Sequence, residues 1–146
     1  MTLYLDASVL VSIVGQEATS HSVDRIIRMQ ASPILISDFA LAEGSAALAR
    51  YARMNHRRTE EVDEMFVELS ALSSGFADRV EIAPGDIAAA TLLVRRHDLK
   101  LRAPDAIHIA AAERLTTTLV TLDINMAAAA RALDLSCINP AEESAA

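Results

Sequence analysis

The stretch Leu3-Tyr4-Leu5-Asp6-Ala7-Ser8-Val9-Leu10-Val11 is a short apolar run that carries a carboxylate and then a hydroxyl. Its first part predicts a buried strand and the part after Asp6 predicts the start of a helix, so we expect Asp6 at the carboxyl end of the strand. In open parallel α/β sheets, ligands bind in the crevice outside the carboxyl ends of the strands. Asp6 is therefore a candidate site residue, although by itself it is an equally good N-cap for the following helix.

Apolar runs and helical patterns alternate along the rest of the chain. We expect further strands at residues 33–36, 80–82, 118–121 and 136–138, with helices at about 8–14, 20–30, 38–53, 59–72, 84–97, 104–115 and 126–133. This alternation predicts an α/β fold with a mainly parallel central sheet flanked by helices. We expect a single domain over residues 1–139 and a flexible tail over residues 140–146, which have nothing to bury.

Composition narrows the function classes. With 146 residues the chain has the length of one domain, and its aromatic content of 3% argues against a surface on which nucleic-acid bases stack. The net charge of −7 argues against binding nucleic acid by bulk charge, but not against a nuclease whose carboxylates hold divalent cations. A lone cysteine, Cys137, excludes an internal disulfide. There is no basic leader and no apolar run of about 18 residues, so we expect a cytoplasmic protein without a membrane anchor.

Four acids occupy comparable places. Asp6 and Asp123 follow predicted strands, while Glu43 and Asp105 lie in the first turns of predicted helices. Right-handed crossovers bring a helix that follows a strand to the same edge of the sheet, which places Glu43 near Asp6. The helix that carries Asp105 follows another helix and not a strand, so the crossover argument does not apply to it. The placement of Asp105 at this edge is an inference. Each acid also has a structural interpretation: a solvated helix residue for Glu43, a helix-dipole partner for Asp105 and a turn former for Asp123.

Clustered carboxylates need a cation, because like charges raise one another's pKa. A ligand set of oxygens favours a hard ion, Mg²⁺ or Mn²⁺. Ser8 and Thr121 are predicted to support the acids by hydrogen bonding, with backbone capping as the alternative for Ser8. His108 lies one helical turn after Asp105, where a satisfied core histidine is the more common case.

These residues resemble a known family. The segments 5–8, 104–110 and 120–123, together with Glu43, are similar to the PIN domain and, more narrowly, to the VapC ribonuclease toxins of bacterial toxin–antitoxin pairs. The resemblance implies an endoribonuclease dependent on Mg²⁺ or Mn²⁺, in which Asp6, Glu43, Asp105 and Asp123 are catalytic and bind the metal. It further implies a homodimer and a VapB-like antitoxin that neutralises the toxin.

Two basic runs are candidates for RNA binding. One contains Arg57 and Arg58, and the other contains Arg96, Lys100 and Arg102 and leads directly to Asp105. The arginine fork can bind a phosphate at two points. The alternative is that both runs are solvated helix ends, where basic residues favour the negative end of the dipole.

Other function classes lack their required residues. A haloacid-dehalogenase-type phosphatase needs a second Asp at the place of Ser8. A receiver-type signalling module needs paired acids at the first strand and a lysine at the last strand, and the only lysine here is Lys100. The alternative that remains open is a catalytically silent PIN-like module that binds proteins.

Overall fold

The computed structural model describes residues 1–15, 18–28 and 33–144, and its centre is a five-stranded parallel sheet. The strand order is β3-β2-β1-β4-β5, with every neighbouring pair parallel. The strands are β1 (Leu3–Leu5), β2 (Ile34–Ser37), β3 (Asp78–Val80), β4 (Thr118–Val120) and β5 (Cys137–Ile138). The expected α/β class and parallel sheet are confirmed.

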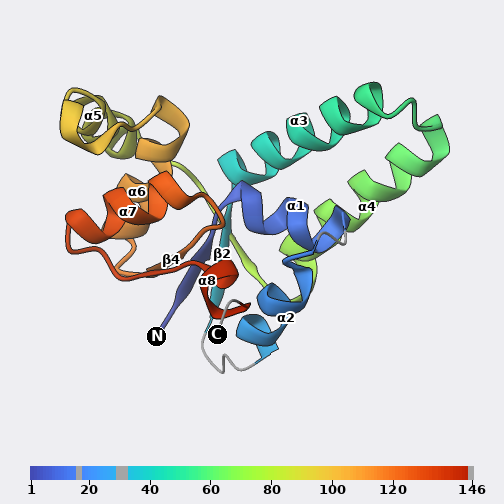
Figure 1. The fold of residues 1–146 in the computed structure, drawn as a ribbon, viewed down its shortest axis with the longest axis horizontal. Coiled ribbons are helices and arrows are strands. Elements are labelled where there is room, and N and C mark those ends of the chain that lie inside the picture. Colours follow the sequence, from blue (N-terminus) through green and yellow to red (C-terminus); the bar gives the residue numbers. More distant parts are fainter. Residues whose placement is uncertain (16–17, 29–32, 145–146) are drawn as a thin grey trace.

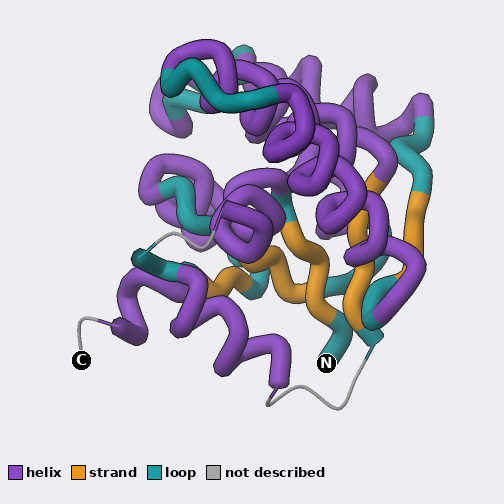
Figure 2. The backbone as a smooth tube through the Cα atoms, turned by 90° about the vertical axis from the view of Figure 1, so that its right-hand side faces the viewer, coloured by secondary structure: helices purple, strands orange, loops and turns teal. Residues whose placement is uncertain are grey.

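Helices cover both faces of this sheet (Figures 1 and 2). They are α1 (Ala7–Gly15), α2 (Ser20–Arg28), α3 (Asp38–Met54), α4 (Thr59–Gly75), α5 (Pro84–Val94), the 3-10 turn η1 (His97–Leu99), α6 (Ala103–Arg114), α7 (Ile124–Ala132) and α8 (Pro140–Ser144). Within the described ranges, no helix has both the length and the apolar character that crossing a membrane requires.

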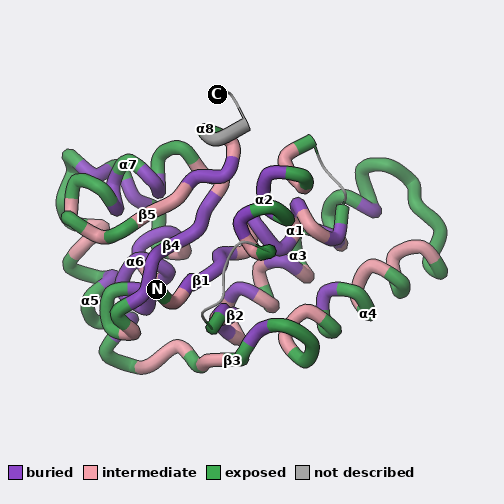
Figure 3. The backbone as a smooth tube through the Cα atoms, turned by 90° about the horizontal axis from the view of Figure 1, so that it is seen from below, coloured by how far each residue is buried: buried purple, intermediate pink, exposed green. Residues whose placement is uncertain are grey.

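Side chains along β1 alternate between the two faces of the sheet, so the core has two parts. Leu3 and Leu5 pack into a cluster with α1, α2, α3 and α4. Tyr4 points to the opposite face and packs with α5, α6 and α7. Because β1 is the central strand and is covered on both faces, its three residues are fully buried (Figure 3). This is why the strand is apolar without a break until Asp6.

The last residue of β2 also begins the next helix. Ser37 ends the strand and caps α3, because its Oγ accepts from the backbone N–H of Ala40 at 3.0 Å. The residues after the strand therefore enter a helix at once. Glu43 consequently lies near the carboxyl edge of the sheet, as the crossover argument predicts.

Several element boundaries differ from the predictions. The edge strand β3 lies at 78–80 and not at 80–82, and α5 ends at Val94 before the separate turn η1. The expected flexible tail is helical as far as Ser144: Pro140 is buried, and α8 packs against α2. Glu142 also pairs with Arg131 at 2.8 Å. Residues 29–30 of the second predicted helix and the end of the tail, residues 145–146, lie outside the described residues.

An ion pair between a buried carboxylate and an exposed arginine joins α5 to α6. The Asp86 carboxylate is 2% exposed and accepts from Arg114 Nε and Nη2, both at 2.8 Å. Arg114 lowers the pKa of Asp86, whose other partner is the backbone N–H of Ala83. The two members are 28 residues apart, so local sequence patterns do not predict this pair.

Replacing Arg114 by Gln is expected to lower the free energy of unfolding by about 1–3 kcal/mol at neutral pH, because a buried carboxylate loses its charged partner. The folded-state pKa of Asp86 lies below its unfolded value, so the stabilisation is present above about pH 4 and is lost as the pH falls through the folded pKa. Urea unfolding of both proteins from pH 7 to pH 3 measures the difference. A difference between the two proteins that stays constant down to pH 3 would contradict this account.

Candidate functional site

Asp6 is held at the end of β1 by three hydrogen bonds. Its Oδ1 accepts from Ser8 Oγ at 2.6 Å and from the backbone N–H of Val9 at 3.2 Å, and its Oδ2 accepts from Thr121 Oγ1 at 2.5 Å. The residue is 2% exposed. Burial raises the pKa of Asp6, and the hydrogen bonds from Ser8 and Thr121 oppose that rise. The hydrogen bond from Val9 is the N-cap contact. Capping does not account for the hydrogen bonds from Ser8 and Thr121.

Ser8 and Thr121 also hold the turn after β4. Ser8 Oγ accepts from the backbone N–H of Leu122 at 2.9 Å, and Thr121 Oγ1 accepts from that of Asp123 at 3.0 Å. Each hydroxyl therefore joins Asp6 to the segment that carries Asp123. Asp123 itself caps α7 through the N–H of Met126 at 2.8 Å.

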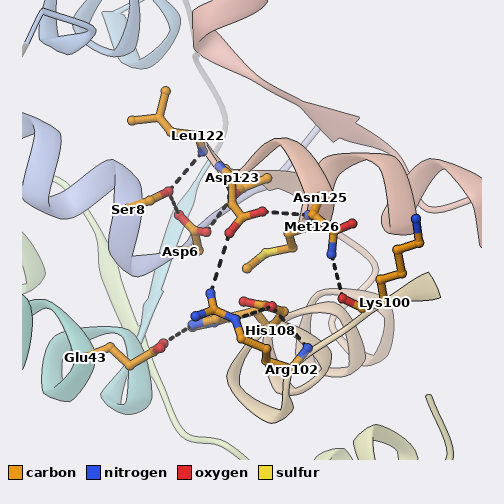
Figure 4. A network of polar contacts seen from close by, with 12 residues as sticks. Asp6, Ser8, Glu43, Lys100, Arg102, His108, Leu122, Asp123, Asn125 and Met126 are labelled. Atoms are coloured by element: carbon orange, nitrogen blue, oxygen red, sulfur yellow. Dashed lines mark hydrogen bonds and ion pairs between the residues drawn. The ribbon is translucent and has the colours of Figure 1, made fainter. Parts of the chain in front are cut away.

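Arg102 contacts two of the four acids, and Figure 4 shows its side chain directed toward Asp123. Its Nε is 3.3 Å from Asp105 Oδ2, and its Nη2 is 3.8 Å from Asp123 Oδ2. Asp105 lies in the first turn of α6 and is 5% exposed. The negative charges of Asp105, Asp123 and Glu43 raise the pKa of Arg102. A cation is thus already present among these acids, and it belongs to the chain itself.

Glu43 reaches the same region from α3 through His108. Its Oε1 hydrogen-bonds Nε2 of His108, and the Glu43 side chain is 29% exposed, as expected for a partly enclosed acid. In Figure 4, Glu43, His108 and Arg102 lie in the same network of polar contacts as Asp6 and Asp123. The structure therefore brings all four predicted acids to one edge of the sheet. We call Asp6, Glu43, Asp105 and Asp123 the acidic edge.

Sequence reasoning missed Tyr4, whose hydroxyl contacts His108 Nδ1 at 2.8 Å. The available signal was an aromatic residue in an otherwise aliphatic strand, two residues before Asp6. His108 is a satisfied, buried histidine, as the sequence indicates, and it is 1% exposed. Its partner Glu43, however, belongs to the acidic edge and not to the core.

The donor chemistry of the acidic edge fits a hard divalent cation, because the groups are carboxylate oxygens and the chain's one thiol, Cys137, lies on β5. In the part of the chain that the structure describes, however, no three Asp, Glu, His or Cys side chains lie close enough to share one ion. Arg102 separates Asp105 from Asp123, and His108 holds Glu43. An ion shared by three of these acids therefore requires the Arg102 side chain to move, which its 76% exposure permits.

The basic residues lie in two different settings. Arg57 and Arg58 both pair with Glu61 at the turn between α3 and α4, about 17 Å along α3 from Glu43. Arg96 pairs with Asp98 at 2.9 Å, and the backbone carbonyl of Lys100 accepts from Asn125 Nδ2 at 2.8 Å. Of the five predicted RNA-binding residues, Arg102 is the one that contacts the acidic edge.

A shallow hollow opens beside the acidic edge. Its volume is about 320 Å³, and it is lined by Ala7, Ser8, Val11, Glu43, Ala47 and Leu122. The small side chains of α1 and α3 leave this space open next to Glu43. A ligand approaching the acidic edge can therefore rest against an apolar wall.

Comparison with known proteins gives one family. A model of the PIN domain matches residues 3–132. No curated protein matches the chain.

Several solved structures share the fold. The toxin VapC20 of Mycobacterium tuberculosis, which cleaves the sarcin-ricin loop, aligns with a TM-score of 0.70 at 16% identity, over 87% of this chain and 94% of that one. VapBC2 of Rickettsia felis, bound to a promoter DNA fragment, aligns with a TM-score of 0.69 at 15% identity, over 95% of this chain and 98% of that one. FitAcB of Neisseria gonorrhoeae aligns with a TM-score of 0.70 at 17% identity, over 94% of this chain and 97% of that one. At these identities the likeness is one of fold.

Proposed function

This chain belongs to the PIN domain family, and from that premise we propose that it is a metal-dependent endoribonuclease toxin of the VapC type. The acidic edge binds Mg²⁺ or Mn²⁺ and cleaves RNA phosphodiester bonds. The protein acts in the cytoplasm, where its RNA substrate lies. The observation that supports the proposal is the gathering of four acids from separate elements at one edge of the sheet, two of them in contact with Arg102.

We assign the four acids the roles that the resemblance to PIN ribonucleases implies. Asp6 and Asp105 bind the ion directly, Asp123 completes the set, and Glu43 is a further ligand or orients the attacking water. A bound divalent cation supplies a centre that lowers the pKa of a water molecule and offsets charge on the phosphate. Ser8 and Thr121 keep the Asp6 carboxylate in one orientation through their hydroxyl hydrogen bonds. Arg102, once released from the acids, is in reach of the substrate phosphate.

Partners are proposed from the similar structures. Several of them, including VapBC2 of Rickettsia felis, are toxin–antitoxin complexes, so we expect a VapB-like antitoxin that neutralises this chain. We also expect a homodimer. The proposed nuclease domain covers residues 1–139, and α8 follows it.

Removal of the metal tests the function. The purified chain, freed of antitoxin, is incubated with a panel of structured RNAs in Mg²⁺, in Mn²⁺ and in EDTA. Cleavage is expected with either ion and is expected to vanish in EDTA, because the carboxylates alone cannot offset the developing charge. Readdition of Mn²⁺ after EDTA should restore cleavage, which separates loss of metal from loss of fold. Cleavage that continues unchanged in EDTA would contradict a metal-dependent mechanism.

Arg102 is expected to compete with the metal. Replacing Arg102 by Gln should raise the affinity of the protein for Mn²⁺ roughly two- to fivefold, because an exposed ion pair is weak but must be broken before the ion binds. Titration calorimetry of the metal-free protein with Mn²⁺ measures the change. Arg96→Gln is the matched control, since Arg96 pairs with Asp98 away from the acidic edge. Equal or weaker Mn²⁺ binding by Arg102→Gln would show that the arginine does not oppose the ion.

The second candidate function is a PIN-like module that binds proteins and has no catalytic activity. It is favoured by the pairing of Arg102 with Asp105 and Asp123, which neutralises these acids without a metal. The two functions differ in metal binding. A folded protein that binds neither Mn²⁺ nor Mg²⁺ would favour the silent module.

A further inference from the structure

A chain of buried hydrogen bonds runs from the middle of the sheet to the acidic edge. The hydroxyl of Tyr4 donates to Ser37 Oγ at 2.9 Å, and Nδ1 of His108 lies 2.8 Å from the same phenol oxygen. The other ring nitrogen of His108 hydrogen-bonds Glu43. Tyr4 and Ser37 are fully buried, and His108 is 1% exposed. The chain of contacts therefore joins β1, the start of α3 and α6 before it ends at a carboxylate.

The imidazole of His108 is fixed by its surroundings. Its ring centroid lies 5.7 Å from that of Tyr4 and 5.3 Å from that of Phe39, so two aromatic rings pack against it. Both ring nitrogens have partners, which are the phenol oxygen and Glu43. Ring packing and two hydrogen bonds together leave the imidazole one orientation.

Glu43 lacks comparable restraints of its own. Its side chain is 29% exposed, and in the described part of the chain His108 is its one hydrogen-bonding and ion-pairing partner. A free glutamate side chain samples several rotamers, and ordering it costs conformational entropy. A rigid partner that is already in place reduces that cost at the moment of ligand binding.

The location of this network is informative about its role. Burying a phenol, a hydroxyl and an imidazole is costly unless each is hydrogen-bonded, and an apolar core would avoid the cost altogether. A network that served the fold alone would end on groups inside the core. This one ends instead on Glu43, whose negative charge acts on Arg102 at the acidic edge.

We propose that His108, held from behind by Tyr4, is a positioning residue that fixes the Glu43 carboxylate at the acidic edge for metal binding. The inference rests on the proposed function, because it assigns Glu43 to the ion. It predicts that Tyr4 and His108 affect the metal affinity only through Glu43.

Two substitutions of His108 separate this role from packing. Glutamine places an amide nitrogen near the position of Nε2 and can still donate to Glu43, whereas asparagine is too short to reach it. His108→Asn is expected to weaken Mn²⁺ binding about tenfold, and His108→Gln by less than about threefold. Tyr4→Phe, which removes only the hydroxyl, should fall between them. The control His21→Asn changes an exposed histidine on α2 and should have no effect.

Coupling to Glu43 is the deciding measurement. Mn²⁺ affinities are compared for Glu43→Gln, His108→Asn and the double variant. The double variant is expected to bind Mn²⁺ as weakly as Glu43→Gln alone, because His108 has no carboxylate left to position once Glu43 is replaced. Losses that multiply would overturn the proposal and leave His108 a purely structural role.

A spectroscopic test on the metal-free protein is independent of nuclease activity. In protein labelled with ¹⁵N-histidine, the resonance that disappears in His108→Gln identifies His108 among the four histidines. Its Nε2 signal is expected to shift in Glu43→Ala, and its Nδ1 signal in Tyr4→Phe. Insensitivity of Nε2 to Glu43→Ala would overturn the contact itself. If Glu43→Ala shifts the Nε2 signal but the wild-type protein binds no Mn²⁺, both the proposed function and the metal-positioning role are overturned, while the contact stands.

Discussion

Asp105→Asn is expected to lower the rate of RNA cleavage by roughly a hundredfold or more, with the fold retained. The substitution removes one negative charge from the acidic edge and with it a ligand of the proposed ion, which supplies several kcal/mol of transition-state stabilisation. The amide oxygen can still accept from the backbone N–H of Arg102, as Asp105 Oδ2 does at 3.3 Å. The start of α6 is therefore preserved, and the loss should be in chemistry rather than in structure.

Single-turnover cleavage in Mg²⁺ measures this effect, with circular dichroism as the check on folding. Asp98→Asn is the matched control, because Asp98 is an exposed acid of η1 whose partner is Arg96. Its rate should stay within about twofold of the wild type, since it lies outside the proposed ligand set. An Asp105→Asn variant that cleaves RNA at a rate near that of the wild type would remove Asp105 from the site.

Leu69→Ala is expected to lower the free energy of unfolding by about 3 kcal/mol, the usual cost of a large cavity in a packed core. Leu69 lies on α4, is 2% exposed and belongs to the core cluster that includes β1 and α3. Its two methyl carbons approach the α3 backbone at Gly44, within 3.5 Å of the position that a side-chain Cβ would take there. The contact supports the turn of α3 that carries Glu43.

Urea unfolding measures the loss, and Val67→Ala on the same helix is the control. Val67 is 69% exposed, so its truncation should change stability by no more than about 0.5 kcal/mol. A loss below about 1 kcal/mol for Leu69→Ala would mean that α4 is not part of the cooperative core. At a temperature where Leu69→Ala remains folded, its cleavage rate should stay close to that of the wild type.

Much of the fold follows from local patterns. The apolar run before Asp6, the Ser37 cap and the alternation of strands with helices depend on neighbours in the sequence, and the structure confirms them. Element ends were less predictable. The position of β3 depends on its pairing with β2, and α8 packs against α2, which is distant in the sequence. Neither element could therefore be located from its own residues.

The sequence by itself determined which residues could carry the chemistry: four acids at strand ends and helix starts, with two hydroxyls beside them. Tertiary structure alone decided how these side chains are paired. Thr121 reaches Asp6 across 115 residues, His108 reaches Glu43 across 65, and Tyr4 meets His108 across 104. It also placed Arg102 between Asp105 and Asp123, when the sequence indicated only a basic run. The physical reason is that propensity and periodicity act over a few residues, whereas contacts between side chains depend on how whole elements pack.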